Sequence, residues 1–173
     1  FNSMKMEQFL NCLTSTASNT GMIFVIIMGA SIFSYFITLS GLPDASVQFI
    51  QNLAAPDFVV LLMLMIMYLI LGSIFDTVAA MVITLPFVYP VIMDMGYDPV
   101  WWGVVNVMIM EIGMITPPIG INVFVLNGMS KDLNLKTIYK GIFPFFLTDI
   151  VRLSIVLIFP ATALWLPKFW GLM

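Results

Sequence analysis

Long apolar runs, separated by short polar or proline-containing stretches, make up most of the chain. Residues 20–40 form one such run, long enough for a helix rising about 1.5 Å per residue to cross a hydrocarbon core of about 30 Å. Residues 57–71, 78–93 and 142–166 are further apolar runs. Because residues 59–71 show none of the period-two alternation of barrel strands, the pattern predicts a bundle of transmembrane helices.

A pair of prolines interrupts the apolar stretch over residues 101–127. A continuous helix over this range would cross a bilayer. Pro117 and Pro118 lack backbone N–H groups and disfavour helical geometry at Thr116, and Gly120 adds conformational freedom. We therefore expect two half-helices joined by unwound backbone at membrane depth. Such a break must be buried in protein or line a cavity, and secondary transporters use such breaks to hold cations and anionic substrates.

Residues 72–77 separate two of the apolar runs, which can be arranged in two ways. In one arrangement, residues 57–71 and 78–93 are two spanning helices joined by a turn in water. In the other, they form a re-entrant hairpin that enters and leaves the membrane on one side, with its tip at membrane depth. Ile74 and Phe75 make the centre of the turn unusually apolar for a loop in water. The residue pattern by itself leaves both arrangements open.

Three segments are more polar than the apolar runs. Residues 4–18 mix charged, polar and apolar side chains, as in an amphipathic helix that lies at the interface or packs along the bundle. Residues 43–53 begin with Pro43 and Asp44, which favour a helix start, and are too short to span, so we expect an interfacial connector. Residues 128–141 are polar and basic. We expect them to form a loop with at most one short helix.

Basic residues give the chain an orientation. Lys131, Lys136 and Lys140 follow the broken helix, so this end is expected in the cytoplasm. Asp94 and Asp98 then lie on the external side. The patterns divide the chain into three parts. Residues 1–56 hold the amphipathic helix, the spanning helix and the interfacial connector, and residues 128–173 hold the cytoplasmic loop and the last spanning helix. Residues 57–127 hold the two apolar runs and the discontinuous helix, which the resemblance described below implies to be a re-entrant hairpin plus a discontinuous helix, the transport domain.

Two charged residues stand three positions apart in the last apolar run, Asp149 and Arg152, so they share one face of a helix. Charges inside a membrane cost at least about 2.5 kcal/mol each and are usually paired. We therefore expect a structural ion pair. Trp165 and Trp170, near the end of the same run, match the aromatic residues found at membrane interfaces.

Composition supports a membrane protein and excludes several kinds of site. The chain is 61% hydrophobic and 9% charged, whereas soluble domains carry about 25% charged residues. It has no histidine and one cysteine, Cys12, which excludes intrachain disulfides and His/Cys metal sites. So few basic residues do not suggest nucleic-acid binding. The chain begins with Phe1 and shows no signal-peptide pattern, and we expect it to be the C-terminal part of a longer protein.

The polar side chains at membrane depth gather around the turn and the break. Sodium prefers hard oxygen ligands, which the hydroxyls of Ser73, Thr77 and Thr116 and the carbonyls freed by the prolines would supply. Asp76 is either a counter-charge for the ion or the N-cap of the segment that follows. Glu111 either faces the same cavity or packs against a polar neighbour. The remaining polar residues at this depth are Asn106 and Asn122.

An enzyme is not expected from these residues. Asp76 and Glu111 are conceivable as a carboxylate pair, but no nucleophile with a base and no metal-ligand set accompanies them. The chain also lacks the G-x-x-x-x-G-K-[ST] motif of nucleotide hydrolysis. A carrier driven by ion gradients is therefore the leading hypothesis, and a channel-like component whose pore is lined by the broken helix is the alternative.

Several motifs, in this order and spacing, resemble the large membrane subunit of the tripartite ATP-independent periplasmic (TRAP) transporters. The motifs are LGSIFD at 71–76, PFVYP at 86–90, GYDPVWWGV at 96–104, IGMITPPIGIN at 112–122, PF at 144–145 and LWLP at 164–167. The resemblance covers nearly the whole chain and matches the second of the two inverted repeats of that family. Relatives commonly have methionine at the position of Phe75 and an uncharged residue at that of Glu111.

The resemblance implies a fold and a function. The fold would be an all-α membrane protein with a re-entrant helical hairpin and a broken helix, one half of an elevator-type ion transporter. Such proteins couple sodium entry to the import of organic acids of the C4-dicarboxylate or sialic-acid type. Implied partners are a small membrane subunit, a periplasmic substrate-binding protein and the lipid bilayer, in a bacterial or archaeal inner membrane. Sodium would be the coupling ion, and no other cofactor is expected.

The resemblance also implies a site, because in that family a sodium ion lies where the hairpin tip meets the break. It favours the re-entrant arrangement of the two runs. The ion-binding residues carried over to this chain are Gly72, Ser73, Asp76, Thr77, Thr116, Pro117 and Gly120, and the substrate-binding residues are Thr116, Pro118 and Asn122.

Overall fold

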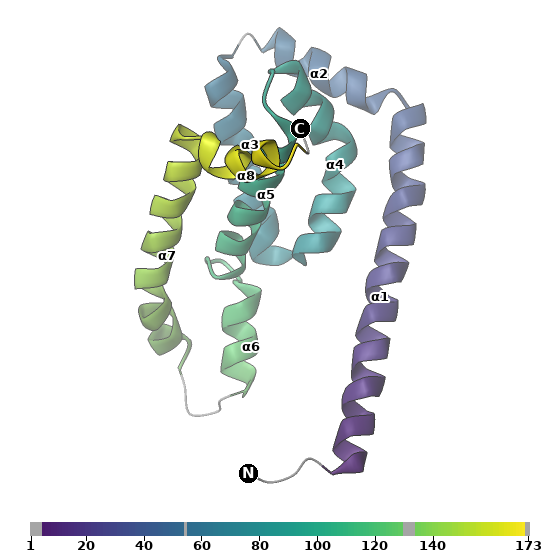
Figure 1. Cartoon of the computed structure of the whole chain (residues 1–173), viewed down its shortest axis with the longest axis vertical. Helices are drawn as coiled ribbons and strands as arrows, with labels where there is room; N and C mark the ends of the chain where they lie inside the picture. Colours follow the sequence, from purple (N-terminus) through teal and green to yellow (C-terminus); the bar gives the residue numbers. More distant parts are fainter. Residues whose placement is uncertain (1–4, 54, 130–133, 172–173) are drawn as a thin grey trace.

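The computed structural model describes residues 5–53, 55–129 and 134–171, and over these ranges the chain is helical (Figure 1). The helices are α1 (Met6–Leu39), α2 (Leu42–Asn52), α3 (Asp57–Ile74), α4 (Thr77–Asp94), α5 (Pro99–Met114), α6 (Ile121–Met129), α7 (Leu135–Ile158) and α8 (Ala161–Phe169). Among the described residues, α1, α3, α4 and α7 are long and apolar enough to cross a membrane, and α5 is a shorter apolar helix. The predicted all-α class is confirmed.

The first helix differs from the prediction at its start. The amphipathic segment expected over residues 4–18 is not a separate element, because α1 runs without a break from Met6 to Leu39. The sequence at the expected junction, Asn19-Thr20-Gly21, contains no proline, and a single glycine costs a helix only about 1 kcal/mol. The apolar run after it therefore extends the helix through the junction.

The end of the chain also differs from the prediction. The helix expected over residues 142–166 begins earlier, at Leu135, where the Asn134 side chain accepts a hydrogen bond from the Lys136 N–H at 3.2 Å. It ends at Ile158 because Pro160 lacks an N–H and disfavours helical geometry in the residue before it, Phe159. The loop expected over residues 128–141 is thus shorter than predicted, and Lys131 lies outside the described residues.

Helix α8 is a separate element that turns across the bundle (Figure 1). Its Leu164 is buried in the core, while Trp165 and Phe169 stack on each other at 5.7 Å and are exposed. The aromatic residues predicted at the end of a spanning helix therefore lie on this short helix instead.

The core forms around α5, which packs mainly on α3 and also contacts α4, α7 and α8. Tyr68 of α3 meets Trp102 of α5 edge to face at 5.9 Å. Trp101 ties α5 to α7, because its indole N–H donates to the Val156 carbonyl at 2.9 Å. Helix α5 is therefore the element against which the other parts are placed.

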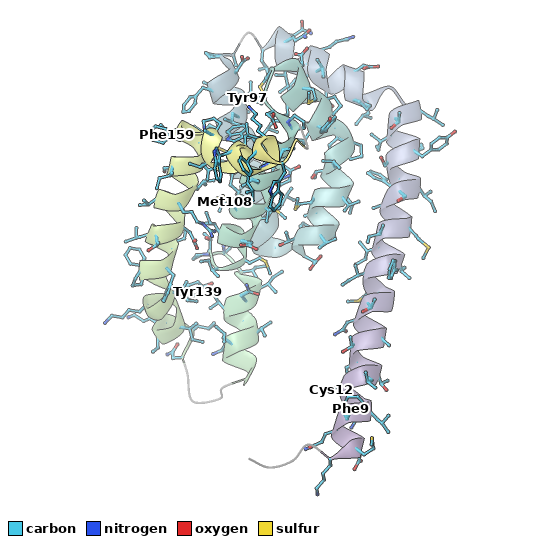
Figure 2. All side chains as sticks on the ribbon, viewed as in Figure 1. Phe9, Cys12, Tyr97, Met108, Tyr139 and Phe159 are labelled. Carbon is cyan, nitrogen blue, oxygen red and sulfur yellow. The ribbon has the colours of Figure 1, made fainter. Side chains whose placement is uncertain are left out.

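Helix α2 is the amphipathic connector that the sequence predicted, and it packs on α4. Its Gln51 side chain donates to both carboxylate oxygens of Asp94, at 3.1 and 3.0 Å. Helix α1 also packs on α4, through buried Ala30 and Ile37. Figure 2 shows Phe9 and Cys12 on the opposite end of α1, which extends well beyond the rest of the bundle.

Candidate functional site

The turn between α3 and α4 meets the break between α5 and α6. Figure 1 places both at the same level, about midway along α1. The Gly120 N–H donates to the Ser73 carbonyl at 3.1 Å, which joins the break to the end of α3. The Thr77 hydroxyl lies 3.0 Å from the Met114 sulfur, which joins the start of α4 to the end of α5. The structure thus brings together segments more than 35 residues apart, and the meeting of residues 72–77 with residues 116–120 is the one that the family resemblance implies.

Two glycines allow this meeting. A Cβ atom on Gly72 would lie 2.6 Å from the Met110 carbonyl oxygen, and one on Gly113 would lie 2.7 Å from that of Leu69. Real Cβ atoms do not come this close to backbone. The backbones of α3 and α5 therefore cross in direct contact at Gly72 and Gly113, within the last turn of each helix.

The carbonyl ends of two helices converge at this crossing, since α3 ends at Ile74 and α5 at Met114. The last carbonyls of a helix lack partners in the next turn and carry its negative partial charge. Ser73 accepts from Gly120, but the carbonyls of Gly72, Ile74, Met114 and Ile115 accept no backbone hydrogen bond from any residue that the structure describes. Two converging helix C-termini with unpaired carbonyls favour a cation.

The candidate hydroxyls donate their hydrogens to nearby acceptors. Ser73, which is buried, donates to the Ile70 carbonyl at 2.8 Å, and Thr116 donates to the Ile112 carbonyl. A hydroxyl that donates its hydrogen keeps oxygen lone pairs, which is the state in which it can bind a cation. Both hydroxyl oxygens thus keep lone pairs for a cation, which is what the predicted sodium site requires of them.

The two candidate carboxylates have different surroundings. Asp76 is the N-cap of α4, because its side chain accepts from the Ala79 N–H at 3.1 Å, so the cap role weighed in the sequence analysis is confirmed. Glu111 is exposed on α5, next to buried Met110 and Ile112. It therefore lies on the surface of the described chain and not in its core. No three His, Cys, Asp or Glu side chains of the described ranges are grouped to hold a metal ion.

The break itself spans residues 115–120 and contains a cis peptide bond between Pro117 and Pro118. Gly120 has a left-handed backbone (φ 63°), and its carbonyl accepts from the Val123 N–H at 2.8 Å, which starts α6. Pro118 and Asn122 are exposed beside this helix start. A helix N-terminus carries positive partial charge and free N–H groups, which suit an anion such as a carboxylate.

Tyr139 of α7 contacts the break, although no sequence pattern marked it. Its hydroxyl donates to the Ile119 carbonyl at 3.0 Å, and Figure 2 shows it beside the break. In the sequence it belongs to a polar, basic stretch that predicted a loop. Only the packing of α7 against α6 brings it to the site.

Asn106, by contrast, lies away from the site. It is 1% exposed in the core of α5, and neither its Oδ1 nor the indole nitrogen of Trp102 has a hydrogen-bond partner among the described residues. The hydroxyls of Tyr68 and Thr84, both nearby in the α3–α4–α5 core, pair with each other at 2.7 Å. Asn106 is therefore a core residue.

Comparisons with known proteins match this chain to one family of transport proteins. Residues 1–162 match the family described as "Tripartite ATP-independent periplasmic transporter, DctM component". The chain is 27% identical over 168 residues to the sialic acid TRAP transporter large permease SiaM of Vibrio cholerae, a match covering 97% of this chain and 39% of the relative. It is 30% identical over 172 residues to the C4-dicarboxylate large permease DctM of Pseudomonas aeruginosa, covering 99% of this chain and 40% of the relative.

A third relative is the isethionate permease DctMQ of Oleidesulfovibrio alaskensis, 30% identical over 153 residues, which cover 88% of this chain and 24% of that protein. The chain thus spans two-fifths or less of the length of these relatives. These relatives are named as permeases, not as enzymes.

Proposed function

The chain belongs to the DctM family of TRAP transporter components, and from that premise we propose that it forms part of a sodium-coupled secondary transporter that imports organic acids. The observation that carries the proposal is the crossing of α3 and α5 at Gly72 and Gly113, which brings two helix C-termini together beside the break. Negative helix ends suit a singly charged hard cation.

The sodium ion would bind at the crossing of α3 and α5. We propose ligands among the unpaired carbonyls of the two helix ends and the hydroxyls of Ser73, Thr77 and Thr116. Gly72 permits the close approach, and Pro117 and Gly120 shape the break. Asp76 would act through its charge and its cap of α4.

The substrate carboxylate would bind at the start of α6. Asn122 lies in the first turn of this half-helix, whose N-terminus carries positive partial charge, and Thr116 and Pro118 precede it in the break. The relatives are named for sialic acid, C4-dicarboxylates and isethionate, which are all organic anions. We propose the C4-dicarboxylate or sialic-acid type for this chain. A cation and an anion bound at neighbouring sites would stabilise each other, which is a simple physical basis for coupling.

We further propose that α3 and α4 form a re-entrant hairpin in a bacterial or archaeal inner membrane and that the site moves across it by an elevator motion. The level of the α3–α4 turn, midway along α1 (Figure 1), supports this arrangement. The partners would be a small membrane subunit and a periplasmic binding protein that delivers the substrate.

The test is uptake of labelled organic acids into proteoliposomes that hold the full-length protein and its small subunit, with the binding protein present. Saturable uptake that requires both an inward sodium gradient and the binding protein is expected. Flux that does not saturate and ignores the gradient would contradict the proposal and point to a channel lined by the break.

A further inference from the structure

One peptide unit of the break is held from two sides. The Ile119 carbonyl accepts from the Tyr139 hydroxyl at 3.0 Å, and the Gly120 N–H donates to the Ser73 carbonyl at 3.1 Å. These two groups belong to the same planar peptide bond. A rotation of that plane would break both contacts together, so the hydrogen bond from α7 restrains the one to α3.

Gly120 is fitted to this contact. Its backbone has φ 63°, a conformation that costs other residues roughly 1–2 kcal/mol. A Cβ atom there would lie 3.2 Å from the Tyr139 hydroxyl oxygen and 3.2 Å from the Thr116 carbonyl oxygen. The absent side chain therefore leaves the space in which the Tyr139 hydroxyl reaches the break.

Apolar packing on this side of the break is incomplete. A cavity of about 260 Å³ separates the break from α7 and is lined by Ile115, Thr116, Pro117, Tyr139, Ile142, Phe143 and Phe146. Because side chains do not fill this space, the hydrogen bond from Tyr139 is the directional contact between α7 and the unwound backbone. Tyr139 itself is placed by Ile138, which is buried, and by the Asn134 cap at the start of α7.

We infer that Tyr139 is a positioning residue for the ion site: its hydroxyl holds the Ile119–Gly120 peptide in the orientation that keeps the Ser73 end of α3 against the break. This inference rests on the proposed function for the identity of the ion. The geometry of the contact does not depend on it.

Tyr139→Phe in the full-length transporter tests this inference, since it removes the hydroxyl and keeps the ring. In the proteoliposome assay, the sodium concentration for half-maximal uptake should rise about two- to tenfold, the range expected for one lost hydrogen bond. Uptake at saturating sodium should stay close to that of the unmodified protein. The control is Tyr35→Phe on α1, whose tyrosine is exposed and makes no hydrogen bond among the described residues; it should leave the sodium dependence unchanged.

Amide hydrogen exchange provides a second measurement that needs no transport. Tyr139→Phe should speed exchange in a peptide containing Gly120 and leave peptides from α1 unchanged. An unaltered exchange rate would show that the Tyr139 hydroxyl does not hold this peptide in place. Faster exchange with an unaltered sodium dependence would show that Tyr139 does not position the ion site. If the unmodified protein shows no sodium dependence at all, the proposed function fails, and the exchange result alone then decides whether Tyr139 holds the break.

Discussion

Gly113 is one of the two glycines at which α3 and α5 are in direct backbone contact. Its Cα faces the Gly72 backbone, so that a Cβ would lie 2.9 Å from the Gly72 Cα. Close contact between helix backbones is a common way to join helices in membranes, where lipid is as apolar as the side chains. This contact brings the ends of α3 and α5 together, and with them the unpaired carbonyls of the candidate ion site.

Gly113→Ala should therefore destabilise the crossing. An added methyl group with no space costs about 1–3 kcal/mol, and we expect a lower thermal unfolding midpoint together with weaker sodium dependence of uptake. Gly103→Ala on the same helix is the matched control, since a Cβ there would meet nothing within 4 Å. Equal midpoints for the two variants would show that the close approach has no energetic consequence.

The role of the Ser73 and Thr116 hydroxyls in binding the ion can be distinguished from the role of their hydrogen bonds within the helix. Thr116→Ala or Ser73→Ala should raise the half-saturating sodium concentration about three- to tenfold, as expected for the loss of about 1 kcal/mol of ion binding. Thr38 on α1 makes the same kind of bond, to the Ser34 carbonyl at 2.8 Å. Thr38→Ala should leave the sodium dependence unchanged, and a shift as large as that of Thr116→Ala would assign both effects to the helix alone.

At the scale of elements, the chain uses prolines in two ways. Helix α4 contains Pro86 and Pro90 and remains helical from Thr77 to Asp94. Pro117 and Pro118 instead end α5, because two adjacent residues lack N–H groups and Gly120, just beyond, adopts a left-handed backbone. The spacing of the prolines therefore decides between a continuous helix and a break.

Replacing Pro117 and Pro118 together with Ala should favour a continuous helix through residues 115–120. Coupled uptake should fall to near background, because the helix ends that hold ion and substrate would be lost, while membrane insertion stays intact. The double variant Pro86→Ala with Pro90→Ala is the control for removing two prolines and should keep most of the uptake. Unchanged uptake in the Pro117/Pro118 variant would remove the break from the mechanism.

At the scale of the molecule, the acidic residues that begin α3 and end α4 lie opposite the basic residues at the starts of α1 and α7. Asp57 begins α3 and Asp94 ends α4, at the upper end in Figure 1. Asp57 lies near Tyr97, whose pKa is raised by burial and by this negative charge. Lys5 precedes α1 and Lys136 begins α7, both at the lower end. The orientation predicted from the basic residues would place this lower end in the cytoplasm.

Cysteine labelling tests the orientation and the hairpin together, in a variant that lacks Cys12. A cysteine at Lys136 should react with a charged reagent from the cytoplasm, and one at Asp94 from outside. A cysteine at Phe75, which is exposed at the turn, should react much more slowly than either, because a re-entrant hairpin keeps the turn at membrane depth. Rapid labelling of position 75 from the cytoplasm would establish two full spans instead.

The sequence alone determined that the chain is built of apolar helices and that one of them breaks at Pro117 and Pro118. Apolar runs specify helices because a membrane satisfies no free backbone groups, and the effect of Pro117 and Pro118 is local. The same locality explains why the Asp76 cap and the Asp149–Arg152 ion pair, found at 3.1 Å, were predicted correctly. The continuity of α1 through Gly21 and the end of α7 before Pro160 were not predicted. The effect of a single glycine or proline on a helix depends on the residues around it.

Only the tertiary structure decided how the segments meet. The Gly72–Gly113 crossing, the Gly120–Ser73 bond and the approach of Tyr139 each join residues far apart in the chain. A pattern along the sequence records which side chains are apolar or polar. It does not record which backbones come into direct contact, because that contact is set by the packing of whole helices against α5.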